Sequence, residues 1–210
     1  MIKAILFDFW GTLVEQGVRS PTQQVKNALQ IDLPFSEYIV RMEKAMMTEQ
    51  FGTLREAFLA VFDEFNVEPR EDILEELIGM WNKSWMLSRP YPEVEAVLKR
   101  LQKKYQIILI SNTDRFSVEK VLEKFSLENY FHKMYLSYQM HQLKTDDHFF
   151  QAILNELDLA PEECLVIGDS IQSDVLAANK FGLKAILLDR RSTREFSPKI
   201  ASLTELEANL

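Results

Sequence analysis

The segment from Lys3 to Thr12, with the sequence Lys-Ala-Ile-Leu-Phe-Asp-Phe-Trp-Gly-Thr, constrains the fold more than any other part of the chain. Residues 5–7 form a continuous apolar run, which is typical of a parallel strand covered by helices on both faces. Asp8 follows this run directly, and Gly11 then allows the chain to turn. Because ligands bind at the carboxyl edge of an open parallel sheet, Asp8 is predicted to be a functional carboxylate rather than only a turn residue.

Composition narrows the classes of protein that fit. The 210 residues are enough for one full domain with an insertion, and the hydrophobic share of 47% is ordinary. No apolar run approaches the roughly 20 residues that span a bilayer, and the first residues carry no export signal, so a cytoplasmic protein without a membrane partner is expected. The net charge of −8 argues against nucleic acid binding. Cys164 is expected to be a small buried hydrophobe, and no pattern specifies an oligomeric state.

Five short apolar runs are predicted to be strands. They are residues 3–7, 106–110, 133–137, 164–167 and 184–188. Segments with helical spacing lie between the later runs, at residues 92–105, 117–125, 147–157 and 173–181. This alternation favours an α/β fold with a parallel five-stranded sheet and helices on both faces.

The interval from residue 21 to residue 85 has helical periodicity throughout and contains no convincing strand. Its breaks at Pro21, Pro34, Gly52-Thr53 and Pro69 predict about four helices. Phe58, Phe62 and Phe65 share one helix face and are expected in a core. We therefore expect a helical cap over residues 17–87, a core formed by residues 1–16 and 88–210, and hinges at residues 15–20 and 87–91.

Polar residues with complementary chemistry follow four of the predicted strands. They are Asp8 with Thr12, then Ser111-Asn112-Thr113, then Lys144, and finally Gly168-Asp169-Ser170 with Asp174. In a parallel sheet these residues meet at one edge, where Asp8 is the predicted nucleophile and Asp169 would hold a hard cation such as Mg²⁺. Ser111 would donate hydrogen bonds to the transferred group. Lys144 would balance its negative charge and keep Asp8 ionised.

These motifs resemble those of the haloacid dehalogenase superfamily of hydrolases, and the resemblance covers essentially the whole chain. The family's first motif, Asp-x-Asp-Gly-Thr, is similar to Asp8-Phe9-Trp10-Gly11-Thr12, and its second and third motifs fall on Ser111 and Lys144. Its acidic fourth motif resembles Gly168-Asp169-Ser170 with Asp174. Residues 177–182 also resemble the helix before the family's last strand. The resemblance implies a Rossmann-like core with a cap inserted after the first motif and an aspartyl intermediate on Asp8. It also implies Mg²⁺ between Asp8, the Trp10 carbonyl and Asp169, with Asp174 close by, and cap closure that excludes water.

Trp10 is the main departure from this family. Its phosphatases usually carry a second Asp at that position, which serves as general acid and then as general base. An indole N–H cannot exchange protons at neutral pH. General acid–base catalysis, which raises the reaction rate by roughly 10²- to 10⁴-fold, is therefore missing from its usual place. The preferred hypothesis is a Mg²⁺-dependent phosphatase of a small phosphorylated metabolite. Its substrate has a good leaving group, or its acid comes from the cap, where Glu15, Glu37 and Glu43 are candidates.

A 2-haloacid dehalogenase is the first alternative hypothesis. In that branch of the family an aromatic residue replaces the second Asp, as Trp10 does here, and Arg41 lies near the position of a halide-binding Arg. A solvated cap residue is the simpler interpretation of Arg41. Asp169 and Ile171 argue against this alternative, because those enzymes carry Ser and Asn there, and so does Phe150, where they carry Tyr.

A weakly catalytic binding or regulatory protein is the second alternative. The loop around Lys144 departs from the family pattern at Gln139, His141 and Thr145, which fits a protein that keeps a Mg²⁺ and phosphate site with little turnover. Under the phosphatase and dehalogenase hypotheses, the residues expected to contact substrate are Trp10, Thr12, Arg41 and Asn112.

Overall fold

Six parallel strands form the main sheet in the computed structural model, which describes residues 1–210. In spatial order they are β5 (Lys133–Leu136), β4 (Gln106–Ser111), β1 (Ala4–Phe7), β6 (Cys164–Gly168), β7 (Lys184–Leu188) and β8 (Lys199–Ile200). The five predicted strands are all present, with bounds within one residue of the prediction. The strand number was wrong by one, because β8 has only two residues and leaves no apolar run to recognise.

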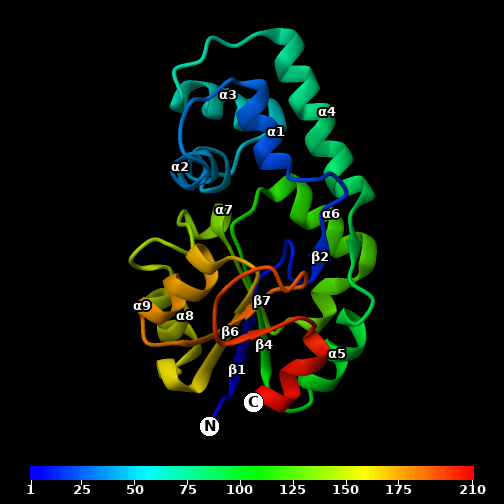
Figure 1. Ribbon diagram of the computed structural model, residues 1–210, viewed down its shortest axis with the longest axis vertical. Helices are drawn as coiled ribbons and strands as arrows, with labels where there is room; N and C mark the ends of the chain where they lie inside the picture. The colour runs from blue at the N-terminus through cyan, green and yellow to red at the C-terminus, as the bar shows by residue number, and fades with distance from the viewer.

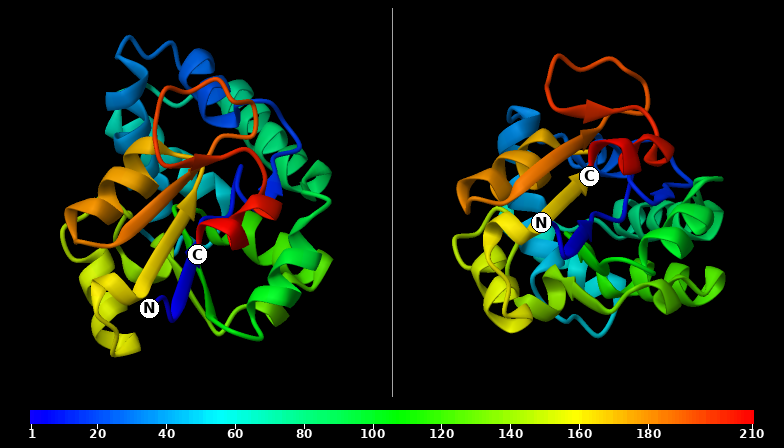
Figure 2. Two further views of the ribbon diagram at one scale, coloured as in Figure 1. Left: turned by 60° about the horizontal axis from the view of Figure 1, so that its bottom comes forward. Right: turned by 90° about the horizontal axis from the view of Figure 1, so that it is seen from below.

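Strand β1 shows how the sheet forms two cores. Ile5 and Phe7 pack with α5 (Val94–Leu101) and α6 (Arg115–Phe125) on one face. Ala4 and Leu6 pack with α8 (Phe149–Leu157) and α9 (Ala177–Lys180) on the other face. Successive side chains of a strand point to opposite faces, so a strand covered on both sides is apolar at every position. Figure 2 shows the helices on both sides of the sheet. Cys164 is fully buried, as predicted.

Four helices form a separate bundle beside the carboxyl edge of this sheet (Figure 1). They are α1 (Pro21–Ala28), α2 (Phe35–Met47), α3 (Leu54–Glu64) and α4 (Glu71–Leu87). A hydrophobic core of fifteen buried residues between Val25 and Trp81 holds them together, and Phe116 of α6 packs against it. Phe58 and Phe62 are buried in it and Phe65 packs against it, as their spacing predicted. Helix α3 begins with a capping box, in which Thr53 and Glu56 bond each other's backbone N–H groups.

A small antiparallel ribbon lies where the chain enters and leaves the bundle. Strand β2 (Val14–Glu15) precedes the bundle and pairs with β3 (Arg89–Pro90), which follows it. Each strand has two residues; β3 lies within the predicted hinge at residues 87–91, and β2 ends at Glu15, the first residue of the predicted hinge at residues 15–20. The ribbon ties the two crossings of the chain to each other.

Short helical turns complete the fold. They are η1 (Leu127–Tyr130), α7 (Ser137–Met140), η2 (Pro161–Glu163), η3 (Ile171–Leu176) and η4 (Leu203–Asn209). Turn η3 is a π-helix that continues into α9, so the predicted helix at residues 173–181 is present but begins earlier and with wider turns. Single π-turns are frequent at functional sites, and η3 follows directly after Asp169 and Ser170. None of the helices is both long and apolar enough to cross a membrane.

Candidate active site

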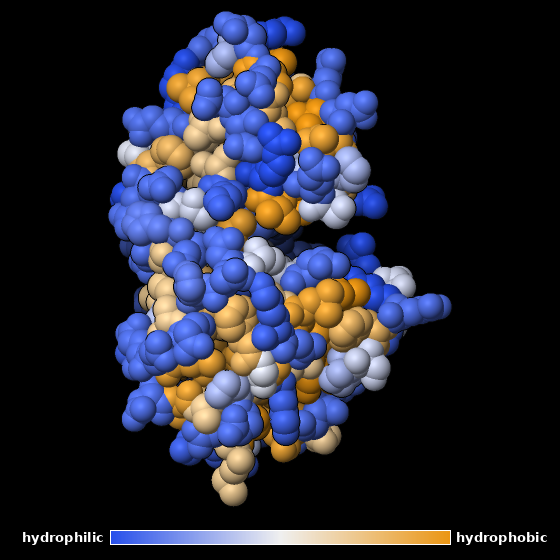
Figure 3. All heavy atoms as spheres, turned by 90° about the vertical axis from the view of Figure 1, so that its left-hand side faces the viewer, coloured by the Kyte–Doolittle hydropathy of each residue, from blue (hydrophilic) through white to orange (hydrophobic).

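A cavity of about 840 Å³ lies between the carboxyl edge of the sheet and the helical bundle. The space-filling view in Figure 3 shows a hollow between the upper and lower parts of the molecule. The sheet side of the cavity includes Asp8, Trp10, Asn112, Lys144, Asp169 and Asp174, and the bundle side includes Thr22, Ile39, Glu43, Met47, Trp81 and Ser84. Residues that the sequence placed at strand ends therefore share one wall of a single cavity.

Asp8 lies at the centre of this wall and is 5% exposed. Its Oδ1 accepts a hydrogen bond of 2.7 Å from Lys144 Nζ, and its Oδ2 accepts one of 2.9 Å from Thr12 Oγ1. Burial raises the pKa of Asp8 to about 6, although the Lys144 ammonium and these hydrogen bonds lower it. Asp8 is therefore mainly ionised at neutral pH, with both carboxylate oxygens fixed in orientation.

Lys144 is the shared cation of the site and is 3% exposed. Its ammonium contacts Asp174 Oδ1 as well as Asp8. Burial lowers the pKa of Lys144, but the two carboxylates raise it by more, so it stays above its usual value and the group remains charged. Asp174 Oδ2 in turn accepts a 2.9 Å hydrogen bond from the Ser170 backbone N–H. The ion pair with Asp174 thus holds the Lys144 side chain in position, and Lys144 in turn holds the Asp8 carboxylate.

Two glycines allow the acidic side chains to approach the backbone. A Cβ at Gly168 would lie 2.1 Å from the Asp174 carboxyl group, and a Cβ at Gly11 would lie 2.4 Å from Asp169 Oδ2. Gly11 also has a φ of +80°, which side-chain-bearing residues rarely adopt. The local sequence therefore matches the close packing that the site requires.

Asp169 makes no ion pair, although the charges of Arg194 and Lys144 lower the pKa of its carboxyl group. Neither of its carboxylate oxygens makes a protein hydrogen bond, whereas its backbone carbonyl accepts one from the Arg194 guanidinium. Burial, followed by the charges of Asp8 and Asp174, raises the pKa of Asp169 to about 7. Oxygens of these three carboxyl groups all lie within 4.8 Å of one another. Three clustered carboxylates against one lysine leave a negative excess, which suits a hard cation with oxygen ligands.

Trp10 uses its indole N–H within the protein. Its Nε1 donates a 3.0 Å hydrogen bond to Thr113 Oγ1, and its ring packs edge-to-face on Phe9 at a centroid distance of 4.9 Å. The side chain lines the cavity and links the loop after β1 to the loop after β4. It occupies the position of an acid without offering a transferable proton.

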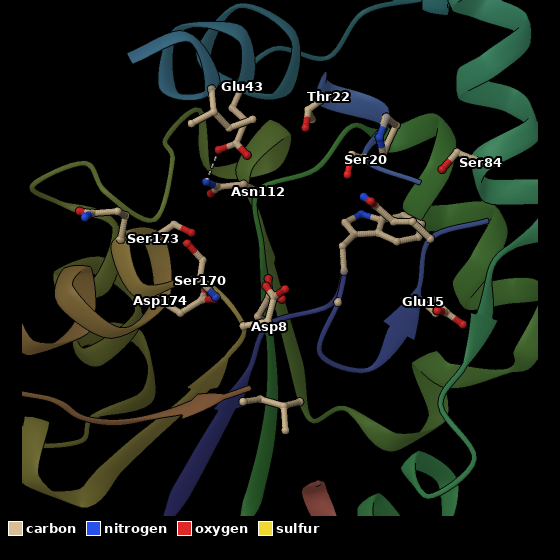
Figure 4. A pocket seen from close by; sticks show the side chains of 18 of the residues that line it. Asp8, Glu15, Ser20, Thr22, Glu43, Ser84, Asn112, Ser170, Ser173 and Asp174 are labelled. Carbon is tan, nitrogen blue, oxygen red and sulfur yellow. Dashed lines mark hydrogen bonds between the residues drawn. The ribbon is translucent and has the colours of Figure 1, made fainter. Parts of the chain in front are cut away.

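Asn112 connects the sheet to the bundle. Its Oδ1 accepts a 2.9 Å hydrogen bond from the Lys144 backbone N–H, and its Nδ2 donates one of 2.8 Å to Glu43 Oε2. Figure 4 shows Glu43 reaching from α2 toward Asn112, with Asp8 on the opposite side of the cavity. Asn112 is therefore positioned to organise both walls.

Three sequence-predicted residues lie elsewhere than expected. Ser111 is fully buried outside the cavity, and its hydroxyl lies 3.5 Å from the Asn112 carbonyl, so it does not face a substrate in this structure. Thr12 is also fully buried and serves Asp8 instead of the cavity. Arg41 lies on the other side of α2, where its Nε pairs with Glu64 Oε1 at 2.6 Å and its guanidinium covers the Phe65 ring. Thr12 and Arg41 therefore do not line this cavity, and their contact with a substrate stays a prediction.

An arginine-rich loop that the sequence interpretation passed over also borders the cavity. Arg190, Arg191 and Arg194 follow β7 and line its sheet side. Arg190 pairs with Glu93 at 2.6 Å and donates a 2.7 Å hydrogen bond to the Thr12 carbonyl. The signal was available, because residues 190–194 follow a predicted strand at the same edge that holds Asp8.

The comparison with protein families agrees with this combination of fold and site. One edge of a parallel sheet here carries an acidic residue after β1, a lysine beyond β5 and two acidic residues after β6. This combination is typical of one class of hydrolases. The family model of the haloacid dehalogenase-like hydrolases matches residues 2–182. The chain belongs to this family.

Two curated relatives of the chain are phosphatases. D-ribitol-5-phosphate phosphatase of Bacteroides thetaiotaomicron is 29% identical over 184 residues, which cover 80% of this chain and 84% of that protein. Human N-acylneuraminate-9-phosphatase is 25% identical over 114 residues, which cover 54% of this chain and 46% of that protein. The match thus spans about half the length of the human relative.

Solved structures of two different enzymes share the fold equally well. A phosphatase of this family from Thermococcus onnurineus aligns with a TM-score of 0.65 at 21% identity, covering 99% of this chain and 97% of that one. The L-2-haloacid dehalogenase from Xanthobacter autotrophicus aligns with a TM-score of 0.65 at 20% identity, covering 99% and 98%. The fold alone does not distinguish between these two reactions.

Proposed function

We propose that the protein is a Mg²⁺-dependent phosphatase of a small phosphorylated metabolite, with Asp8 as the nucleophile. The observation that carries this proposal is Asp169, a carboxyl group without an ion pair beside the Asp8–Lys144 pair. Three clustered carboxyl groups suit a divalent cation with oxygen ligands, and phosphoryl transfer benefits from one. The activities of the two curated relatives support the same class of substrate.

The proposed reaction has two displacements at phosphorus. A carboxylate oxygen of Asp8 attacks the phosphorus, the bond from phosphorus to the leaving oxygen breaks, and an aspartyl-phosphate remains until water displaces it. Thr12 and Lys144 hold the carboxylate in place, and the Lys144 charge stabilises negative charge that develops on the phosphoryl oxygens. Mg²⁺, when bound, supplies charge neutralisation between nucleophile and phosphate. Asp8, the Trp10 carbonyl, Asp169 and Asp174 are the groups that would hold it.

Residues 17–87 are the proposed cap, and residues 1–16 with 88–210 are the proposed catalytic core. The segments 15–20 and 87–91 are the proposed hinges, and the β2–β3 ribbon pairs the beginning of the first with the second. Hydrogen bonds join the two parts around the cavity: Glu43 to Asn112, Trp81 Nε1 to Asp114 Oδ2 at 2.9 Å, and His141 to the Thr48 carbonyl. Such contacts suit a closed state that excludes water during phosphoryl transfer.

Dehalogenation is the competing hypothesis, and two features weigh against it. The Asp169 carboxylate would repel the carboxylate of a 2-haloacid. Arg41, the candidate halide ligand, is paired with Glu64 outside the cavity. Trp10 remains the one feature that favours it.

The test measures phosphate release from p-nitrophenyl phosphate with Mg²⁺ and with a chelator, beside halide release from 2-chloropropionate. We expect Mg²⁺-dependent phosphate release that is lost in Asp8→Asn. Asp147→Asn is the matched control, since Asp147 is an exposed partner of Lys180 remote from the carboxylate cluster. Halide release that a chelator leaves unchanged would establish the dehalogenase instead. Absence of both activities, with Mg²⁺ binding retained, would favour the regulatory hypothesis.

A further inference from the structure

The position of Trp10 leaves the leaving group without a proton donor. Three carboxyl groups near the bundle could take this role, and the structure separates them. Glu37 is exposed on α2 beside Arg41 and does not line the cavity. Glu15 also lines the cavity, but it is exposed on β2 and makes no hydrogen bond to the residues that hold Asp8. Glu43 lines the cavity and is only partly exposed.

Helix α2 presents Glu43 to the cavity by its periodicity. Ile39, Glu43 and Met47 recur every four residues and all line the cavity, so they lie on one helix face. Tyr38 and Met42 lie on the face that is buried in the bundle core. Packing of α2 therefore fixes the direction in which Glu43 points, and Figure 4 shows it reaching toward the sheet edge.

One oxygen of Glu43 is anchored and the other is free. Oε2 accepts the 2.8 Å hydrogen bond from Asn112 Nδ2, while Oε1 makes no protein hydrogen bond. Asn112 is itself held by the Lys144 backbone N–H, and the Lys144 ammonium holds Asp8. Asn112 and the Lys144 residue, which bonds Asn112 through its backbone and Asp8 through its side chain, thus relate the position of Glu43 to that of Asp8. The free oxygen of Glu43 can carry a proton.

We propose that Glu43 is the general acid that protonates the leaving oxygen and the general base that then activates water. In the first step the Asp8 carboxylate forms a bond to phosphorus, the bond to the leaving oxygen breaks, and that oxygen takes the proton of Glu43. In the second step the Glu43 carboxylate takes a proton from water, whose oxygen attacks phosphorus and displaces Asp8. The proposal rests on the proposed phosphatase function.

The surroundings of Glu43 suit this exchange of protons. Burial raises the pKa of Glu43 to about 7. The Asn112 hydrogen bond and the Lys144 ammonium lower it, and the charges of Asp8 and Asp174 raise it. A group with a pKa near the working pH is efficient both as an acid and as a base. Glu43 belongs to the bundle and Asp8 to the sheet. The proposed acid and the nucleophile therefore share one active site only when the bundle lies against the sheet edge.

The test uses a series of substituted phenyl phosphates of similar shape, from p-nitrophenyl phosphate to p-cresyl phosphate, with Glu43→Gln and Glu37→Gln. Glu37→Gln is the matched control, on the same helix but outside the cavity. We expect Glu43→Gln to slow phosphorylation by p-cresyl phosphate by roughly 10²- to 10⁴-fold, and by p-nitrophenyl phosphate far less, since the p-nitrophenolate anion leaves without protonation. A burst of p-nitrophenol is expected in this variant, because hydrolysis of the aspartyl-phosphate loses its base.

A second measurement does not depend on turnover. In protein labelled with carboxyl-¹³C glutamate, the resonance that disappears in Glu43→Gln is expected to titrate near neutral pH. A resonance that titrates in the ordinary glutamate range, or an equal loss of rate across the phenyl phosphate series, overturns the role of Glu43 while the phosphatase proposal stands. Failure of the wild-type protein to release phosphate from any member of the series overturns both.

Discussion

The sheet edge and the helical bundle fill their interiors in opposite ways. The sheet edge buries Asp8, Lys144 and Asp174 in contact with one another. The bundle core consists of fifteen apolar side chains between Val25 and Trp81. Buried charges require fixed partners, whereas apolar packing is non-directional. Asp8, the proposed nucleophile, is thus fixed by ion pairs at the sheet edge, whereas the bundle contributes Glu43 and part of the cavity wall from a separate apolar core.

Removing the shared cation is expected to have the largest effect on stability. Lys144→Met leaves Asp8 and Asp174 buried without a counter-charge, which costs about 3–5 kcal/mol when a buried pair is broken. Urea denaturation at pH 8 measures this change. Lys180→Met, which removes an exposed partner of Asp147, is the control and should change little. A loss below about 1 kcal/mol for Lys144→Met would mean that the sheet edge does not depend on its charges.

Mg²⁺ is expected to stabilise the sheet edge through Asp169. At a concentration 100 times its dissociation constant, a ligand that binds only the folded state adds about 2.7 kcal/mol. Thermal denaturation with and without MgCl₂ should show this gain in the wild-type protein and in Asp147→Asn, but not in Asp169→Asn. Equal gains in all three proteins would place the cation away from the carboxylate cluster.

Without a metal, stability is expected to fall as the pH rises from about 4 to about 7. The pKa values of Asp8 and Asp169 are raised to about 6 and about 7 in the folded state, so over this range the folded protein binds more protons than the unfolded chain. A pKa that differs by 1 between the folded and unfolded states changes the free energy of unfolding by about 1.4 kcal/mol. Chelated protein unfolded by urea at several pH values measures the slope. Asp169→Asn should flatten it, and a wild-type slope of the opposite sign would contradict the raised pKa values.

The smallest expected change in stability is for a substitution in the bundle. Thr53→Ala removes the capping box of α3 and should cost about 1 kcal/mol of stability. Phosphate release from p-nitrophenyl phosphate should be unchanged, since Thr53 lies outside the cavity. Urea denaturation together with this assay separates the two properties. A loss of activity that matches the loss of stability would show that the bundle and the sheet edge are not independent.

The sequence predicted the strands and helices whose apolar runs or helical spacings extend over several residues. Five apolar runs and four helical segments gave the sheet and the bundle, because strands covered on both faces must be apolar at each position. Strands β2, β3 and β8 were missed, since two residues cannot form a pattern. The rule that parallel strands end at one edge brought Asp8, Lys144 and Asp169 to one site.

The remaining site residues depended on tertiary packing that no local pattern encodes. The sequence offered Glu37, Arg41 and Glu43 on one helix, but only the rotation of α2 about its axis decides which of them faces the cavity. Likewise, Ser111 ends its strand at the expected place, yet its side chain lies outside the cavity and Asn112 is presented instead.

The β2–β3 ribbon brings together the two points at which the chain enters and leaves the bundle, a geometry that protein engineering can use. Glu15 and Arg89 are direct antiparallel partners, and such partners lie only about 5 Å apart between Cα atoms. A two-residue hairpin turn spans this distance. A tight turn or a helical bundle from another protein can therefore span from Glu15 to Arg89 in place of residues 16–88. The replacement must also cover Phe116 and Asp114, however, because they contact the present bundle.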